Sequence, residues 1–350
     1  MHLSQRLGLQ WPLIQAPMAG VQTSALAVAV CRTGALGSLP AAMFTPQALH
    51  DELQRLQAQC EGRAYNVNFF CHSPPPSDDA AEQAWRRALA PHYQAFGINA
   101  ANIPAGPGRQ PFSAEVAQVL AAFKPAVVSF HFGLPDASLL AAIKAWGAMV
   151  LSSATTVDEA RWLQAHGADA IIAQGLEAGG HRGHFLSHDL SLQMGTLALL
   201  PQVVRAVTVP VVAAGGIADA AGVAAAMALG ASAVQVGTAY LLSDEATTSA
   251  VHRAALASPQ AAHTALTNVF TGRPARGIVN RVMRELGPIS PLAPAFPLAT
   301  SAVAPLRTAA EAQGSGDYSP LWSGQNASAC RAASAADITL ALAAGFGAAA

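Results

Sequence analysis

Two glycine-containing turns in the second half of the chain could hold a phosphate group. Gly215-Gly216 follows the apolar run 209–214, and Gly237-Thr238 closes the run that begins at 233. Glycine has no Cβ, so its backbone N–H can approach a ligand closely, and a helix that starts next attracts an anion. The residue types leave a second interpretation open, in which these glycines only make tight turns.

His131 ends the apolar run 126–132 and is a candidate for proton transfer. An imidazole has an ordinary pKa near ~6.5, which suits removal of a carbon-bound proton close to neutral pH. A single histidine in a strand is more often a hydrogen-bonded core residue. Its type alone therefore leaves both roles open.

The sequence predicts neither a metal site nor a disulfide framework. His181, His184 and His188 lie close together, but their spacing does not match HExxH or a similar ligand pattern. The four cysteines lack CxxC spacing. We expect them to be reduced thiols.

Eight short apolar runs alternate with longer Ala- and Leu-rich stretches. We expect strands at 12–17, 35–39, 65–70, 126–132, 148–153, 169–174, 209–214 and 233–237. Most are continuously apolar, which is typical of parallel strands buried on both faces. Residues able to cap a following helix are Thr23-Ser24, Ser113, Thr155-Thr156 and Asp219.

A strand–helix unit repeated eight times predicts an α/β fold, specifically a (β/α)8 TIM barrel. A doubly wound open sheet is the alternative, which the absence of GxGxxG after the first strand disfavours. In a barrel, the loops after strands seven and eight often bind phosphate, and His131 would lie at the mouth. We expect the barrel at 1–250 and an additional C-terminal helical or extended segment, 251–350, packed on it.

The composition argues against several kinds of partner. Lys+Arg total 19 and Asp+Glu 20, for a formal net charge of −1, so no basic surface is expected for nucleic acid or an anionic membrane. No apolar run reaches the ~18 residues of a spanning helix, and the N-terminus lacks a signal-peptide pattern. We expect a cytoplasmic protein, and its apolar composition is compatible with a homodimer.

Several segments together resemble the nitronate monooxygenases, formerly called 2-nitropropane dioxygenases. They are PLIQAPMAGV at 12–21, NVNFF at 66–70, SFHFGLP at 129–135, AQGLEAGGHRG at 173–183, PVVAAGGIAD at 210–219, QVGTAYL at 235–241 and YSPLWSGQ at 318–325. Each segment alone is weak evidence for this family, but the whole set in this order is specific for it. A wider group with similar turns includes the FMN-dependent enoyl-ACP reductases.

The resemblance implies FMN as the cofactor. Carried over by position, it implies FMN contacts from Met18, Asn68, Gln174, Gly179, Gly180, Gly215, Gly216, Gln235, Val236, Gly237 and Thr238. In that family the histidine that matches His131 is catalytic. His181 and Tyr318 are candidates for binding the anionic substrate, and Trp322 and Gln325 for covering the flavin. Packing of the C-terminal segment is the alternative for Tyr318.

By this resemblance the chain is expected to be an FMN-dependent nitronate monooxygenase. It would oxidise alkyl nitronates, such as propionate 3-nitronate, with O2 to carbonyl compounds and nitrite. The alternatives are an FMN-dependent enoyl-ACP reductase or NADH:quinone reductase on the same barrel. A non-enzymatic FMN-binding regulatory barrel is a third possibility.

Overall fold

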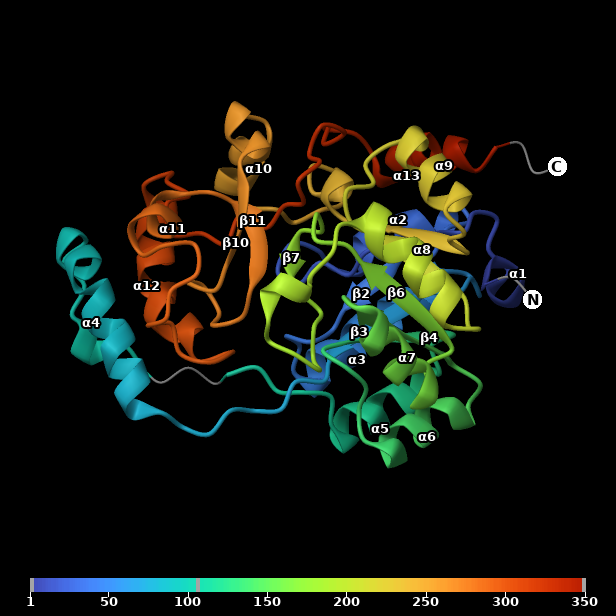
Figure 1. The fold of residues 1–350 in the computed structure, drawn as a ribbon, viewed down its shortest axis with the longest axis horizontal. Coiled ribbons are helices and arrows are strands. Elements are labelled where there is room, and N and C mark those ends of the chain that lie inside the picture. The colour runs from blue at the N-terminus through green and yellow to red at the C-terminus, as the bar shows by residue number, and fades with distance from the viewer. Residues whose placement is uncertain (1–2, 105–107, 348–350) are drawn as a thin grey trace.

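Eight parallel strands close into a barrel in the computed structural model, which describes residues 3–104 and 108–347 (Figure 1). The strand order is β1-β9-β8-β6-β5-β4-β3-β2, and a parallel bridge between Ile14 and Leu36 completes the circle. These strands are β1 (Leu13–Gln15), β2 (Ser38–Pro40), β3 (Asn66–Phe70), β4 (Val127–His131), β5 (Met149–Ala154), β6 (Ala170–Gln174), β8 (Val211–Ala214) and β9 (Ala233–Val236). The TIM-barrel prediction is confirmed.

All eight strands fall within or beside the apolar runs predicted from the sequence. Strands β3, β5, β6 and β8 are buried at every position, because one face lines the barrel interior and the other packs against helices. The predicted and observed strand lengths differ most at the start of the chain. There β1 and β2 span three residues each, since only that part of each run pairs with a neighbouring strand.

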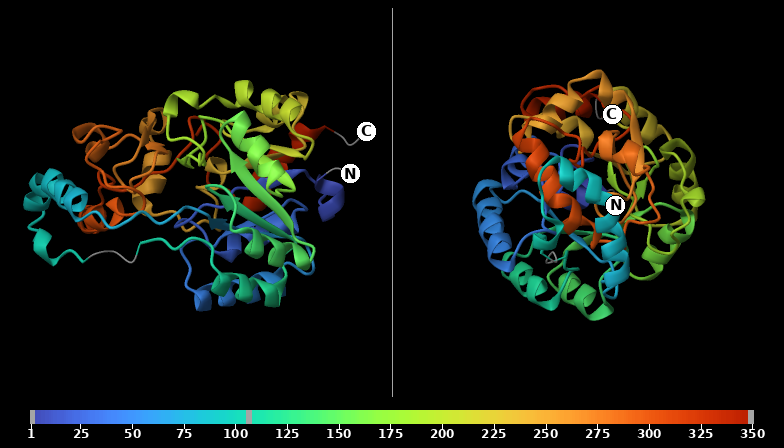
Figure 2. Two further views of the ribbon diagram at one scale, coloured as in Figure 1. Left: turned by 60° about the horizontal axis from the view of Figure 1, so that its bottom comes forward. Right: turned by 90° about the vertical axis from the view of Figure 1, so that its left-hand side faces the viewer.

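Helices surround the barrel as a ring, seen end-on in the right-hand view of Figure 2. They are α2 (Ser24–Arg32), α3 (Pro46–Gln59), α5 (Ala114–Phe123), α6 (Ala137–Ala145), α7 (Val157–Ala165), α8 (Thr196–Ala206) and α9 (Ala220–Ala228), while α1 (Leu3–Leu7) precedes β1. The expected caps form: Thr23, Ser113, Thr156 and Asp219 each accept a backbone N–H bond at a helix start. These bonds satisfy N–H groups that have no partner within the helix.

A second lobe lies beyond the carboxyl ends of the strands (Figures 1 and 2). It contains α10 (Ala250–Leu256), α11 (Arg281–Glu285), α12 (Ala299–Ala312), β10 (Thr264–Thr267) and β11 (Ala275–Ile278). It also contains α4 (Asp79–Ala95), which leaves the barrel after β3. The fully buried Trp85 of α4 donates to the Ala299 carbonyl of α12, and Tyr93 donates to that of Ala302.

The last helix, α13 (Ala335–Ala343), returns to the barrel and packs between α2 and α9. The hydroxyl of Thr339 lies 2.9 Å from that of Tyr240, which follows β9. This helix therefore occupies the place of the eighth barrel helix, about a hundred residues after its strand. The division at residue 250 stays a prediction, and the lobe combines residues from both sides of it.

The short strand β7 (Gly180–His181) links the barrel to the lobe. It belongs to the long loop after β6 and pairs antiparallel with β11, with Gly180 opposite Arg276 and His181 opposite Ala275. This pairing fixes the loop over the open end of the barrel.

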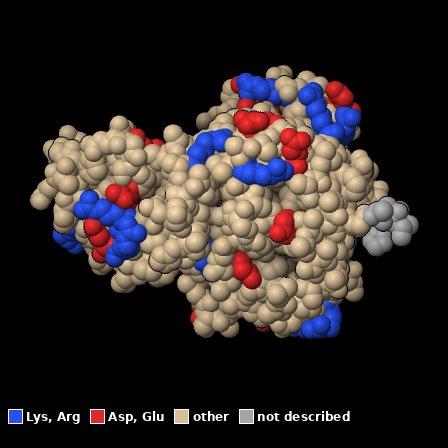
Figure 3. Space-filling model, turned by 90° about the horizontal axis from the view of Figure 1, so that it is seen from above, with Lys and Arg blue, Asp and Glu red and all other residues tan. Residues whose placement is uncertain are grey.

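Charged side chains are sparse and of mixed sign on the face shown in Figure 3, and much of that face carries none. Over the described residues, no helix is both long and apolar enough to cross a membrane.

Candidate active site

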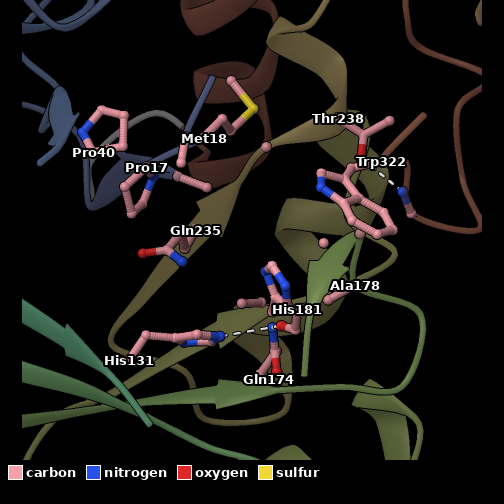
Figure 4. A pocket seen from close by; sticks show the side chains of 18 of the residues that line it. Pro17, Met18, Pro40, His131, Gln174, Ala178, His181, Gln235, Thr238 and Trp322 are labelled. Carbon is pink, nitrogen blue, oxygen red and sulfur yellow. Dashed lines mark hydrogen bonds between the residues drawn. The ribbon is translucent and has the colours of Figure 1, made fainter. Parts of the chain in front are cut away.

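A cavity lies at the carboxyl ends of the barrel strands and extends toward the lobe (Figure 4). Every barrel strand or the turn after it contributes to its wall, and lobe residues close the other side. The strand-end residues include Met18, Pro40, Asn68, Phe70, His131, Ser153, Gln174, Gly215, Gly216, Gln235, Gly237 and Thr238, and the other contributors include Gly179, Gly180, His181, Arg109, His252, Trp322, Gly324 and Asn326. The cavity is therefore at the end of the barrel that carries function in this fold.

Three of the candidate cofactor and substrate residues do not line this cavity. Gln325 lies beside a neighbouring hollow, where its backbone N–H donates to the Glu177 carbonyl at 2.9 Å. Val236 is 1% exposed, and its side chain belongs to the core between strand and helices. Tyr318 is also 1% exposed and lies in the core of the lobe, with its hydroxyl 2.9 Å from His92 Nδ1. The structure supports the packing alternative for Tyr318, and it is Trp322, four residues later, that reaches the cavity.

Two glycine turns lie together on one side of the cavity. Gly215 and Gly216 have φ values of +117° and +73°, which L side chains rarely adopt, so this turn depends on glycine. The C-terminal segment holds both turns: Asn326 Nδ2 donates to the Gly216 carbonyl at 3.1 Å, and Thr238 Oγ1 accepts from Gly324 N–H at 2.9 Å. The expected phosphate turns are brought together, with two contacts that the sequence did not reveal.

The polar side chains at the strand ends differ in whether their atoms already have hydrogen-bond partners. Asn68 Nδ2 donates to Ser129 Oγ at 2.9 Å. Gln174 bridges the loop after β6, since its Nε2 donates to the His181 carbonyl at 2.9 Å and its Oε1 accepts from Gly183 N–H at 2.8 Å. Gln235 Oε1 is buried without a partner among the described residues. A buried acceptor of this kind is costly unless a ligand donates to it.

Gly179 is needed for a close approach of the chain to itself. A Cβ at this position would lie 2.5 Å from Gly324 N and 2.6 Å from Ser323 C, much closer than atoms can pack. The C-terminal segment thus passes directly over the loop after β6.

His131 is held by both ring nitrogens. Nε2 lies 3.1 Å from the His181 carbonyl, which can only accept, so Nε2 carries the proton and donates. Nδ1 then accepts from Ser153 Oγ at 3.0 Å. The pKa of His131 is lowered to about 3, mainly by burial; the bond to the His181 carbonyl opposes this shift, and the nearby Arg273 and Arg182 contribute to it. The ring is therefore neutral at neutral pH.

His181 faces the same cavity from the other side, as Figure 4 shows. Its Nε2 lies 2.9 Å from Thr271 Oγ1 of the lobe, and its ring packs 5.7 Å from Trp322 and 5.4 Å from Phe296 between ring centroids. Burial lowers the pKa of His181 well below its usual value, and Arg109 is the next largest cause. This histidine is also neutral at neutral pH.

Arg182 is an important residue that the sequence interpretation missed. Its side chain is fully buried and donates to the carbonyls of Gly175 at 2.6 Å and Gln174 at 2.8 Å. Two further bonds reach Gln193 Oε1, at 2.8 and 3.0 Å. Burial lowers its pKa to about 10, so it stays charged at neutral pH. Only its position after His181 in a glycine-rich loop could have drawn attention to it.

An aromatic cluster from three parts of the chain lies beside the cavity, and Phe70 of this cluster lines it. Phe70, Phe132 and Phe296 form one buried cluster, with ring centroids 4.9 to 6.2 Å apart. His72 packs against Phe296 at 4.8 Å. Because these residues are distant in sequence, their spacing carried no signal.

Comparison with known proteins gives consistent matches over nearly the whole chain. A model of the nitronate monooxygenase family matches residues 2–345. A nitronate monooxygenase of Pseudomonas aeruginosa is 43% identical over 345 residues, covering 96% of each chain. One from Paraburkholderia phytofirmans is 43% identical over 339 residues, covering 95% of this chain and 91% of the other.

Solved structures agree with these matches. A nitroalkane oxidase from Streptomyces ansochromogenes has a TM-score of 0.89 at 40% identity and covers 98% of this chain and 97% of its own. FabK from Thermotoga maritima has a TM-score of 0.72 at 26% identity and covers 98% and 95%. The similarity is greater to the nitroalkane oxidase than to FabK.

We predict that Arg182→Met destabilises the loop after β6. The substitution leaves the Gln193 amide oxygen without its donors and removes a charged donor from the carbonyls of Gln174 and Gly175, the second of which keeps its bond from Ala178 N–H. Each bond to a charged group contributes about 1.5–3 kcal/mol. The free energy of unfolding, measured by urea denaturation, should fall by about 3 kcal/mol or more. Arg161→Met, which removes an arginine from an exposed ion pair on α7, should change it by less than about 0.5 kcal/mol. Equal effects would contradict this role of Arg182.

Proposed function

The chain belongs to the nitronate monooxygenase family, and from that premise we propose that its cavity holds FMN and oxidises alkyl nitronates with O2 to carbonyl compounds and nitrite. Family membership makes it an oxidoreductase. The observation that carries the proposal is that paired glycine turns, an unpartnered buried acceptor and two neutral histidines share one cavity. The cytoplasmic location and the homodimer expected from the sequence stay predictions.

The residues present fit a flavin nucleotide. The turns at Gly215-Gly216 and Gly237-Thr238 would hold its phosphate through backbone N–H groups. Gln235 Oε1, which is buried without a partner, would accept from an N–H on the polar edge of the ring. When bound, FMN would supply the electron transfer between nitronate and O2, and the protein supplies position and electrostatics.

His131 and His181 would hold the substrate. Both rings are neutral because of burial, so they present hydrogen-bonding groups without a permanent charge. For a neutral nitroalkane, His131 Nδ1 is the atom able to take the carbon-bound proton, because Nε2 already carries one. Ser153 Oγ–H occupies Nδ1 in this structure and would have to rotate away. For a nitronate, already deprotonated, no base is required.

The reductase alternatives have less support. The relatives at 43% and 40% identity are named for nitronates or nitroalkanes, whereas FabK is 26% identical. A regulatory barrel that only stores FMN would have no use for two neutral histidines facing the cavity.

The purified yellow protein should consume O2 and release nitrite when given propionate 3-nitronate. We would measure O2 uptake with an electrode and nitrite colorimetrically, with NADH alone as the parallel reaction. Rapid reduction of the flavin by NADH with no response to the nitronate would overturn the proposal and favour a reductase.

The phosphate turn can be tested with Gly216→Asp. A carboxylate here would repel the phosphate, so the dissociation constant of FMN should rise at least ~10-fold, as followed by flavin fluorescence. Gly216→Ala is the matched control, because it introduces the same strain at a φ of +73° without the charge. Equal flavin loss in both variants would attribute the effect to backbone strain and remove the support for a phosphate site.

His131→Asn should lower activity on the neutral nitroalkane much more than on the nitronate. Without Nδ1 as a proton acceptor, kcat/KM for a neutral nitroalkane should fall ~100-fold or more, within the range of general-base catalysis. The value for the matching nitronate should fall less than ~10-fold. Equal losses on both substrates would show that His131 is not the base.

A further inference from the structure

Arg109 places at the cavity a positive charge that has no acidic partner among the described residues. It lines the cavity together with His181, Phe70 and His131, and no Asp or Glu is among the lining residues. With the described residues, its guanidinium makes no hydrogen bond or ion pair. Its one recorded side-chain contact is with the Phe296 ring, whose centroid is 5.7 Å from the guanidinium carbon.

The position of Arg109 is fixed by its backbone. Its carbonyl accepts from His72 Nε2 at 2.9 Å, and Phe112 N–H donates to the Phe70 carbonyl at the end of β3 at 2.8 Å. The segment is therefore tied to the barrel on the substrate side. Arg109 is a fixed part of the cavity wall.

The positive charge of Arg109 is not part of the glycine turns that are expected to bind phosphate. They are held by Gly324 and Asn326 of the C-terminal segment. Arg109 instead belongs with the aromatic side, where Phe296 contacts both it and His181. Arg109 and His181 line the same cavity and contact the same ring, so the guanidinium lies on the side where the substrate is expected.

A half-buried guanidinium without an acidic partner is poised to bind an anion. Arginine stays protonated in proteins and presents a planar set of donors that matches a carboxylate. A nitronate group held at His131 and His181 would leave this donor set free for a second negative group on the same molecule.

We propose that Arg109 binds a carboxylate at the far end of the nitronate and so selects doubly negative nitronates over simple alkyl nitronates. The proposal rests on the proposed function, because it assumes that the nitronate group lies at the two histidines. It assigns substrate preference to a residue from the connection between the lobe and the barrel.

The test compares Arg109→Met with the wild type on two substrates. For propionate 3-nitronate, KM should rise about 10- to 100-fold, which corresponds to loss of a hydrogen bond between charged groups. For propyl-1-nitronate, KM should change less than ~2-fold, and kcat should be largely retained on both. Arg109→Lys, which keeps the charge but not the planar donor set, should be intermediate.

Arg87→Met is the matched control, since it removes an exposed arginine from α4 of the same lobe. It should leave both KM values unchanged. Equal losses on both substrates in Arg109→Met would show that Arg109 acts on the nitronate group or on cavity shape. No change on either would show that it faces no substrate group. Either result overturns the proposal.

A binding measurement separates this proposal from the proposed function. Succinate has the same chain length between its two anionic groups as propionate 3-nitronate, and butyrate lacks one of them. Calorimetric titration of the flavin-loaded protein should show tighter binding of succinate than of butyrate, and Arg109→Met should abolish the difference. If the wild type oxidises neither nitronate, the proposed function fails, and the succinate titration still decides the role of Arg109. Equal affinity for the two acids in the wild type would overturn that role.

Discussion

A buried arginine holds the open end of the barrel in one arrangement. The Arg182 guanidinium joins the carbonyls at the end of β6 to Gln193, across a loop of about twenty residues. Without the guanidinium, the Gln193 amide oxygen would lose its donors and the two carbonyls would lose a charged donor, at a cost that restricts the path of the loop. On this path the His181 carbonyl accepts from both His131 and Gln174. The position of the candidate catalytic ring thus depends on a charge that does not line the cavity.

The cavity is built jointly by the barrel and the lobe. The carboxyl ends of parallel strands lie at the same end of the barrel, so the side chains that follow them converge there. The lobe then closes that face through the pairing of β7 with β11 and through the contacts of Gly324 and Asn326 with the glycine turns. Arg109 of the cavity wall contacts Phe296, which comes from a separate connection. Substrate preference is accordingly expected in the lobe, and cofactor binding in the barrel.

Most residues at strand ends or in the segments of the resemblance could be predicted, and Arg109, which lies in neither, could not. His131 and the glycine turns were found because the apolar runs mark where each strand stops, and Gln174 and Gln235 were carried over from the family resemblance at such strand ends. The resemblance also included Val236, whose position next to Gln235 in the strand directs its side chain into the core. Tyr318 came from a motif and lies in the lobe, because a motif does not state which of its aromatic side chains faces the cavity. Arg109 had no signal in the sequence, and Arg182 had only its position after His181 in a glycine-rich loop, since their partners are distant or are backbone carbonyls.

The sequence by itself determined the barrel, its eight strands, the strand-end residues and the family resemblance. These follow from local periodicity and from motifs, which are properties of neighbouring residues. Only the tertiary structure decided that α4 joins the lobe, that α13 completes the ring and that the histidines are neutral. Burial and the pairing of distant segments set these features. No single stretch of sequence contains them, because each depends on which surfaces the folded chain removes from water.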